Sequence, residues 1–184
     1  MVKCKPITPK SLGIAQKSPI DWESIINAEL SILNKLYSCG YPLSSIEKRE
    51  VVVDMLDKTI RVEEYVNNGP LSHYGQISIM GLKTVQPQVV LNKILWDEGD
   101  IYSSQQIERA QQKLIQSELF SSVLITHAET LNEEGRLAMK MHVEEAKHKN
   151  FGFGVTYATI DGPGGTLSWV NRNFRGLGEK LFLE

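Results

Sequence analysis

The sequence predicts an α+β fold in which an internal repeat is followed by a β-rich tail of different character. Each half of residues 18–145 shows helical apolar spacing and then two segments with strand-like alternation. Short strings recur in matching places: Ser44–Ile46 returns as Ser121–Val123, and Val62–Glu64 returns as Val143–Glu145. These matches lie 77 and 81 residues apart. They indicate an internal repeat of about 80 residues.

The composition excludes several classes of protein. The chain has 184 residues, of which 41% are hydrophobic and 23% charged, as in ordinary globular domains. Its 20 Lys and Arg against 22 Asp and Glu give a net charge of −2, which excludes a strongly basic nucleic-acid clamp. No apolar run reaches about 18 residues, so we expect no transmembrane helix, and Met1–Pro6 lacks the apolar core of a signal peptide. Cys4 and Cys39 make neither a disulfide framework nor a zinc ribbon, and the sequence is compatible with either a pair or two free thiols.

A helix and two strands are predicted for the first half. Ser18–Asp21 offers a helix start with a proline in the first turn, and Gly40 and Pro42 mark the helix end. Residues at helical spacing form its predicted apolar stripe, and a second set widens it: Trp22, Ile26, Leu30, Leu33 and Tyr37, widened by Ile25, Ile32 and Leu36. β-Branched and alternating residues predict two strands, at 50–54 and 60–66. The breaker Asn67–Pro70 follows, and we expect a domain boundary near residues 71–74.

The second half predicts a strand, two helices and a hairpin, in the order β-α-α-β-β. The expected elements are a strand at 74–81, a short helix at 86–96, a second helix from Ser103, and strands at 123–127 and 137–143. Ser103 and Gln106 form a capping box for the second helix, whose predicted buried stripe is Ile107, Ala110, Leu114 and Ile115. Alternation is cleanest in the last strand, where Leu137, Met139, Met141 and Val143 share the face expected to be buried. The first half lacks a clear counterpart of the opening strand and first helix.

Residues 151–183 alternate large and small side chains. Phe151, Phe153, Val155 and Tyr157 share one face of a predicted strand, and Gly152, Gly154, Thr156 and Ala158 share the other. A turn at 161–165, a strand at 166–173, a turn at 176–178 and a third strand from Lys180 complete the tail. Because glycine weakens a soluble strand, the pattern favours a membrane barrel with apolar residues toward lipid, and an ordinary soluble hairpin is the alternative. Without the rest of a barrel, we expect such a tail to be disordered or to pair with another chain.

The residues offer little support for an enzyme. His127 and His142 fall on paired strands, but no cysteine or carboxylate spacing completes a metal site, so we expect no metal and no cofactor. Glu63–Glu64 and Glu144–Glu145 lie at matching strand ends and are interpreted as a solvated rim. Gly162–Gly165 lacks the Lys and Ser/Thr of a phosphate-binding loop, and no nucleophile elbow is present. The sequence therefore predicts a protein that is not an enzyme.

Several motifs together resemble one family of bacterial outer-membrane proteins. Tyr157–Gly164 is similar to the first-strand-and-loop signature of TamA-type outer-membrane assembly proteins, and Trp169–Lys180 is similar to the W-x-x-R-N-x-x-G-x-G-E stretch that follows it. Upstream segments resemble the joints between the POTRA domains of this family: Gly40–Pro42, Asn68–Pro70 and Tyr74–Gly81. Glu98–Tyr102 and Leu119–Val123 resemble interior POTRA positions. The resemblance covers residues 18–183, and the order and spacing of the motifs carry it.

The resemblance implies a domain layout, because the family joins periplasmic β-α-α-β-β POTRA repeats to an outer-membrane barrel. We expect tandem POTRA-like domains, a partial one at 1–72 and a complete one at 73–149, followed by the first strands of a truncated transmembrane β-barrel at 150–184. After Asn150 only 34 residues remain. Even a small barrel needs roughly 8 strands of about 10 residues, so we expect the chain to be a fragment.

The resemblance also implies a function at the periplasmic face of the outer membrane, where such proteins bind client strands and pass them to the barrel. The implied partner-binding edge is the strand Val123, Leu124, Ile125, Thr126 and His127, to which a client adds by backbone hydrogen bonds. The implied gate is the first barrel strand, Phe151, Gly152, Phe153, Gly154, Val155, Thr156, Tyr157 and Ala158. The implied partners are unfolded outer-membrane protein or autotransporter clients, other subunits of the assembly machinery, and outer-membrane lipid.

Two other classes of function are compared with this one. A soluble periplasmic protein-interaction adaptor, built of the same modules without a barrel, is the main alternative, and it predicts a natural chain that ends near residue 184. A single-stranded RNA binder would need exposed aromatic and basic residues on a sheet face. The predicted strands instead carry aliphatic residues on one face and acidic residues on the other, so we expect no nucleic-acid partner.

Overall fold

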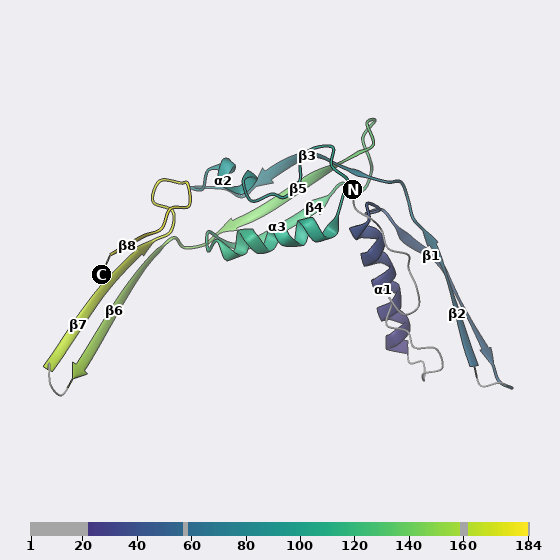
Figure 1. The fold of residues 1–184 in the computed structure, drawn as a ribbon, viewed down its shortest axis with the longest axis horizontal. Coiled ribbons are helices and arrows are strands. Elements are labelled where there is room, and N and C mark those ends of the chain that lie inside the picture. Colours follow the sequence, from purple (N-terminus) through teal and green to yellow (C-terminus); the bar gives the residue numbers. More distant parts are fainter. Residues whose placement is uncertain (1–21, 57–58, 159–161, 184) are drawn as a thin grey trace. The chain divides into compact units, whose positions relative to one another are not determined.

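The computed structural model describes residues 22–56, 59–158 and 162–183, and it confirms the α+β class. Along the described residues a helix and two strands are followed by a strand, two helices and five further strands (Figure 1). The chain divides into two compact units. The first comprises the chain up to Gly75 with residues 97–105 and 129–138, and the second comprises residues 76–96, 106–128 and 139–184.

In the first unit one helix lies beside one β-hairpin. α1 (Trp22–Ser38) is followed by β1 (Ser45–Asp54) and β2 (Thr59–Asn67), which pair antiparallel along their lengths. Arg49 of β1 ties the helix to the hairpin, because it forms ion pairs with Glu29 of α1 and, at 3.1 Å, with Glu64 of β2. The two predicted strands are confirmed, and each is longer than the sequence pattern indicated.

The buried face of α1 includes Ile25 and Leu36 from the widened edge of the predicted stripe and lies away from the centre of that stripe. Ile25, Ala28 and Leu36 are buried, whereas Trp22, Ile26 and Leu30 are 62%, 40% and 53% exposed. Neighbouring positions on a helix are about 100° apart, so an error of one residue turns most of a stripe away from its partner. The apolar residues of α1 cover more than one face, and the hairpin buries only one of them. The predicted helix start at Ser18–Asp21 lies outside the described residues.

The second unit is built on a three-stranded sheet of order β3-β5-β4. β3 (His73–Met80) precedes α2 (Pro87–Leu91) and α3 (Ser104–Gln116), and β4 (Phe120–His127) and β5 (Arg136–Glu145) form the closing hairpin. The predicted alternation is confirmed in β5, where Leu137, Met139, Met141 and Val143 are all at most 1% exposed. Ile107, Ala110 and Leu114 are the buried residues of α3, which lies along one face of this sheet in Figure 1.

The helices of this unit correct three details of the prediction. α2 spans five residues rather than the eleven from 86 to 96, because the chain turns at Asn92. The capping box at Ser103 does not form: the Ser103 N–H donates to Tyr74 Oη at 2.9 Å, and Gln106 Nε2 donates to Leu95 O at 3.2 Å. Ile115 is 42% exposed, so the stripe of α3 ends at Leu114.

The tail forms a separate sheet of order β6-β7-β8. β6 (Lys149–Ala158), β7 (Gly162–Asn171) and β8 (Leu181–Leu183) pair antiparallel. The predicted turn at 161–165 is too long, since Gly162 to Gly165 already pair with β6. The tail is therefore ordered as paired strands rather than disordered, and pairing of its edge with another chain stays a prediction.

Candidate functional site

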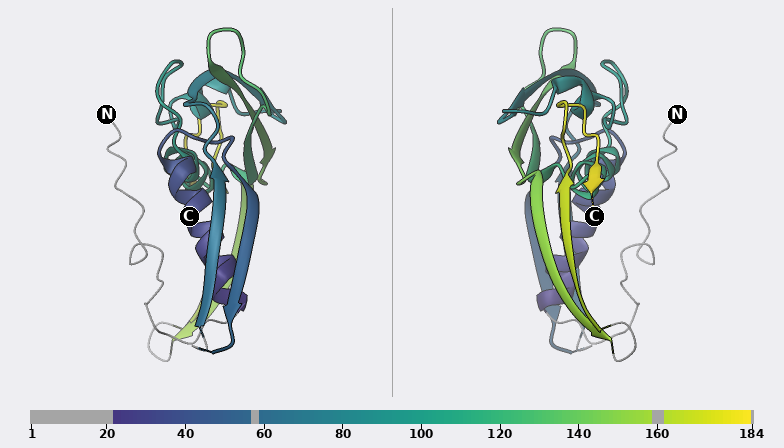
Figure 2. Two further views of the ribbon diagram at one scale, coloured as in Figure 1. Left: turned by 90° about the vertical axis from the view of Figure 1, so that its right-hand side faces the viewer. Right: turned by 90° about the vertical axis from the view of Figure 1, so that its left-hand side faces the viewer.

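β6 and β7 form a hairpin whose two faces carry different chemistry. The strands pair without interruption from Lys149↔Asn171 to Ala158↔Gly162, and Figure 2 shows them side by side along their lengths. Because side chains alternate along a strand, the two members of each cross-strand pair share a face. Phe151↔Trp169 and Phe153↔Leu167 lie on one face, and Gly152↔Ser168 and Gly154↔Thr166 lie on the other.

The apolar face of the hairpin is open to solvent. Phe151, Phe153, Val155 and Tyr157 are 69–83% exposed, and Leu167 is 75% exposed. A shallow groove on the hairpin is lined by Phe151, Phe153, Leu167, Trp169 and Leu183 with Gly152 and Ser168. A contiguous apolar patch of this kind is typical of a surface that contacts lipid or another protein.

The opposite face of the hairpin sets glycines against hydroxyl groups. A Cβ at Gly152 would collide with Ser168 Oγ, and one at Gly154 would lie 2.7 Å from Thr166 Oγ1. The same relation holds with the strands exchanged, since a Cβ at Gly164 would lie 2.9 Å from Thr156 Oγ1. The glycines therefore leave room for the hydroxyl side chains of the facing strand, which accounts for the small-residue alternation seen in the sequence.

The eight residues of the predicted gate, Phe151 to Ala158, all lie in β6. β6 is the outermost strand of its sheet, and no strand of the described residues pairs with its outer edge. An unpaired edge presents a row of backbone N–H and C=O groups that another strand can use. The geometry therefore permits strand addition at β6.

The predicted partner-binding strand, Val123 to His127, lies in β4. β4 is the outermost strand beside β5, with which it pairs from Val123↔Val143 to His127↔Met139. Ile125 is 7% exposed and faces the core, whereas Leu124 is 56% exposed on the opposite face. Strand addition at this edge would place alternate client side chains on the solvent face beside Leu124.

Backbone hydrogen bonds fix the segment between β2 and β3 to the residues that follow α1. The Ser72 N–H donates to Gly40 O at 2.9 Å, and Ser72 O accepts from the Tyr102 N–H at 3.0 Å. Tyr74 is fully buried, and its hydroxyl donates to Ser103 O at 2.7 Å while accepting from the Ser103 N–H. We call Gly40, Ser72, Tyr74, Tyr102 and Ser103 the first joint. Its bonds link Gly40 to Ser72, Ser72 to Tyr102, and Tyr74 to Ser103, all within the first unit.

The cysteine beside this joint is part of a disulfide. Cys39 is disulfide-bonded and 9% exposed, and Cys4 lies outside the described residues. The sequence allowed either a cysteine pair or two free thiols, and the free thiol is therefore excluded for Cys39. An oxidised cysteine is typical of an extracytoplasmic compartment.

Two glutamates that the sequence placed on a solvated rim are instead enclosed and bonded. The side chain of Glu145 is 7% exposed, and its carboxylate accepts the N–H groups of residues 83, 84 and 85 at 2.7 to 3.1 Å and the Thr84 hydroxyl at 2.6 Å. Burial alone would raise the pKa of Glu145, but these hydrogen bonds outweigh it and lower the pKa to about 2. Glu64, 13% exposed, is ion-paired with Arg49. The rim interpretation is therefore wrong for Glu64 and Glu145.

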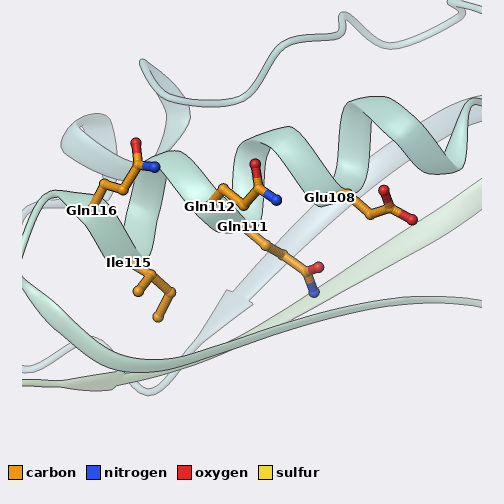
Figure 3. Close-up of a pocket in the computed structure, with 5 residues that line it drawn as sticks. All are labelled: Glu108, Gln111, Gln112, Ile115 and Gln116. Atoms are coloured by element: carbon orange, nitrogen blue, oxygen red, sulfur yellow. The ribbon is translucent and has the colours of Figure 1, made fainter.

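A depression along α3 is a feature of the helix surface rather than a converging site. Its lining residues, labelled in Figure 3, are Glu108, Gln111, Gln112, Ile115 and Gln116. One helix supplies all of them, whereas a ligand site draws polar groups from several elements. Across residues 22–56, 59–158 and 162–183, no group of three His, Cys, Asp or Glu side chains could hold a metal, and no helix is long and apolar enough to cross a membrane.

Comparison with known proteins finds a family match in the second half of the chain. Residues 72–146 match the model of the POTRA family, described as surface antigen variable number repeat. A putative outer membrane protein assembly factor of Treponema pallidum (strain Nichols) is 27% identical over 157 residues. That match covers 82% of this chain and 18% of the relative, so the chain spans less than a fifth of the length of this relative.

Solved structures share the fold over most of the chain. BamA from Haemophilus ducreyi lacking POTRA domains 1–3 superposes with a TM-score of 0.81 at 18% identity, covering 92% of this chain and 32% of that one. POTRA3-5 of Haemophilus influenzae BamA gives a TM-score of 0.59 at 20% identity over 67% of this chain and 48% of that one. CdiB from Acinetobacter baumannii superposes with a TM-score of 0.51 at 16% identity, covering 89% of this chain and 30% of that one. At these identities the likeness is one of fold.

Proposed function

We propose that this chain is a periplasmic, partner-binding region of an outer-membrane protein assembly or translocation factor. The observation that carries the proposal is the two-faced hairpin β6–β7, which follows a POTRA domain directly and exposes Phe151, Phe153 and Leu167. Apolar residues on one face and small or polar residues on the other are typical of strands that cross an outer membrane. The assembly-factor relative and the BamA-like fold support the same assignment.

The proposed layout keeps three parts: a partial POTRA domain at 1–72, a complete one at 73–149, and first barrel strands at 150–184. Its partners are unfolded outer-membrane protein or autotransporter clients, other assembly subunits, and outer-membrane lipid. Within the superfamily we favour the TamA-like branch, on the signature segments Tyr157–Gly164 and Trp169–Lys180. The role is one of binding and transfer, without catalysis or a cofactor.

In the proposed mechanism, a client first adds as a strand to the outer edge of β4. Backbone hydrogen bonds give affinity that tolerates many sequences, which suits a varied set of clients. The client then pairs with the outer edge of β6, where Phe151 to Ala158 act as the gate. An edge strand that carries glycine at alternate positions pairs weakly with a neighbour, so an incoming strand can replace that neighbour.

Lipid binding by the hairpin face is tested with vesicles of brominated and ordinary phospholipid. We expect brominated lipid to quench Trp169, which pairs with Phe151 on the apolar face, and Trp22→Phe and Trp96→Phe changes make this signal specific. Phe153→Ser should weaken vesicle binding about tenfold or more, because a buried aromatic ring contributes about 2 kcal/mol. Thr166→Ser, on the opposite face, is the matched control. Absence of quenching in the otherwise folded chain would contradict the membrane role and favour the soluble adaptor.

Client binding at β4 is tested by photocrosslinking to an unfolded outer-membrane protein. A photoreactive residue at Leu124, which is exposed on β4, should capture the client, and one at Gln112, which is exposed on α3, should not. A synthetic strand from the client should compete at Leu124. Equal capture at both positions would exclude the edge-specific mode.

A further inference from the structure

We propose that Glu145 is a positioning residue that fastens two loops to each other, residues 83–86 after β3 and residues 172–179 after β7. Through this fastening the hairpin strands would move with the POTRA domain. The proposal goes beyond the proposed function, since it requires neither a client nor a membrane. It rests on contacts within the second compact unit.

The first of these loops is shaped around the Glu145 carboxylate. Oε1 accepts the N–H groups of Lys83, Thr84 and Val85 at 2.7, 2.9 and 2.9 Å, and Oε2 accepts the Thr84 hydroxyl. Three successive N–H groups reach one acceptor only when the backbone curves around it. Without the carboxylate these donors would lose a charged partner, which is costly for groups that are not fully solvated.

The second loop is shaped in the same way by Glu179. Its Oε2 accepts the N–H groups of Arg175 at 3.3 Å and Leu177 at 3.2 Å, and Asn173 Oδ1 accepts the Gly178 N–H at 3.1 Å. The N–H of Glu179 itself, together with those of Arg175 and Leu177, lowers the pKa of this carboxylate. The loop therefore has a defined form that it can present to a neighbour.

The two loops meet through two hydrogen bonds and one close backbone approach. The Gln86 N–H donates to Gly176 O at 2.9 Å, and Asn173 Nδ2 donates to Thr84 Oγ1 at 3.1 Å. Gly176 has φ +87°, and a Cβ there would lie 2.9 Å from Thr84 O, so only glycine allows this approach. We call residues 83–86, Glu145, Asn173 and Gly176 the second joint.

Glu145 controls this contact through the Thr84 hydroxyl. A hydroxyl has one proton and two acceptor lone pairs. Thr84 donates its proton to Glu145, so the oxygen faces Asn173 as an acceptor. Glu145 therefore acts on Asn173 and Gly176 through Thr84 and its loop. Removing the carboxylate would release the backbone of residues 83–85 and let the Thr84 hydroxyl rotate.

Residues that flank this joint attach the same two regions. The Arg172 N–H donates to His148 O at 2.9 Å, and the Arg172 side chain forms an ion pair with Glu118. Gly178 packs against Leu119, since a Cβ at this glycine would lie 2.9 Å from Leu119 Cδ1. His148 also contacts Glu145, since its Nε2 lies 3.4 Å from Glu145 Oε2. The Arg172–Glu118 pair and the Gly178–Leu119 contact do not involve Glu145, and they should keep the hairpin folded when Glu145 is changed.

The test is amide hydrogen exchange on the 184-residue chain carrying Glu145→Gln. We expect exchange in residues 83–86 to rise about tenfold or more, as when a hydrogen bond to a charged acceptor is lost, and exchange in residues 174–179 to rise with it. Glu144→Gln, on the adjacent exposed residue of β5, should leave both loops unchanged. A rise confined to residues 83–86, with residues 174–179 as in the parent chain, would overturn the proposal.

A second pair of variants decides the matter if Glu145→Gln unfolds the chain. Thr84→Val removes the hydroxyl and leaves the backbone N–H groups of the loop on the carboxylate. We expect it to raise exchange in residues 174–179 several-fold while residues 83 and 85 stay protected, and Thr84→Ser should restore the parent pattern. Equal protection of residues 174–179 in Thr84→Val and Thr84→Ser would contradict the role of the hydroxyl.

Discussion

The first joint and the second joint fasten chain segments with different chemistry. The first uses neutral groups: backbone hydrogen bonds of Gly40, Ser72 and Tyr102 and the buried Tyr74 hydroxyl. The second uses a carboxylate that accepts three backbone N–H groups and the Thr84 hydroxyl, lies 3.4 Å from His148 Nε2, and has a pKa lowered to about 2. The difference indicates that one connection is insensitive to pH over the physiological range and below it, whereas the other depends on a charge.

Gly40→Val should give the largest effect, because it damages the first joint sterically. Gly40 has φ +101°, and a Cβ there would lie 2.7 Å from Leu71 Cδ1 and 2.8 Å from Ile101 Cγ2. We expect a loss of about 4 kcal/mol in the free energy of unfolding, from backbone strain and overpacking together. Urea denaturation measures it. Gly135→Val is the control, since Gly135 has φ +73° with no atom within 4 Å of its Cβ position. Equal losses would show that crowding at the first joint contributes nothing.

Glu145→Gln should give the next largest effect, and it should depend on pH. The folded pKa of about 2 lies below the ordinary value of 4.5, so the stabilisation is complete above pH 4.5 and is lost as the pH falls toward 2. We expect a loss of up to about 3 kcal/mol at pH 7, shrinking toward zero at low pH. Chemical denaturation of both chains from pH 7 to pH 2 measures this. A pH-independent difference would mean that the carboxylate acts by shape alone.

Tyr74→Phe should cost less and should not vary with acid pH. The change leaves the buried Ser103 N–H and C=O without their partner, for which we expect a loss of about 2 kcal/mol. Burial raises the pKa of Tyr74 above its ordinary value of 10, so the hydroxyl keeps its proton throughout the acid range. Unfolding titrations at pH 7 and pH 4 should give the same difference. A loss that changed with acid pH would assign a titrating group to the first joint.

Glu118→Gln should have the smallest effect and the clearest dependence on salt. Glu118 pairs with Arg172 on the surface, and this pair lowers the pKa of Glu118. Exposed ion pairs add little stability and are screened by salt. We expect a small shift in the unfolding midpoint at low ionic strength that disappears in about 1 M salt, where the screening length is about 3 Å. A shift in the unfolding midpoint that persists at high salt would show that the Glu118–Arg172 pair behaves as part of the second joint rather than as a screened surface ion pair.

Much of the fold could be predicted from periodicity, most accurately where a strand has one buried face. The alternation from Leu137 to Val143 identified β5 and its buried side chains. Successive side chains of a strand point to opposite faces, so the apolar set can lie on only one of them. The same alternation, continued by one step, places Glu145 on the buried face, so a sequence signal for this residue existed. Its charge argued for solvent, and the donors that satisfy it come from residues 83–85, about 60 positions away. Sequence reasoning has no means to find such long-range partners.

Features that depend on tertiary partners were predicted less well. The stripe of α1 was ambiguous because apolar residues occur on several of its faces, and packing against one hairpin selected Ile25, Ala28 and Leu36. The capping box at Ser103 does not form, because the Ser103 N–H donates to the hydroxyl of Tyr74 instead. For the candidate sites, the face segregation of β6 follows the alternation in the sequence, and the edge position of β4 is the one that the family resemblance implied. The strand addition proposed there depends on a partner that the chain alone does not specify.

The glycine–hydroxyl face of the hairpin also limits how β6 and β7 can slide past each other. A slip of one residue would set the aromatic row of one strand on the face where the other carries hydroxyls, and it would bring side chains against Ser168 and Thr166. A slip of two residues would keep both faces matched, with Phe151 opposite Leu167 and Gly152 opposite Thr166. The register of β6 against β7 can therefore shift only in steps of two residues, about 7 Å along the strand. The alternation of residue types along the two strands, rather than a turn, would set the size of each register shift.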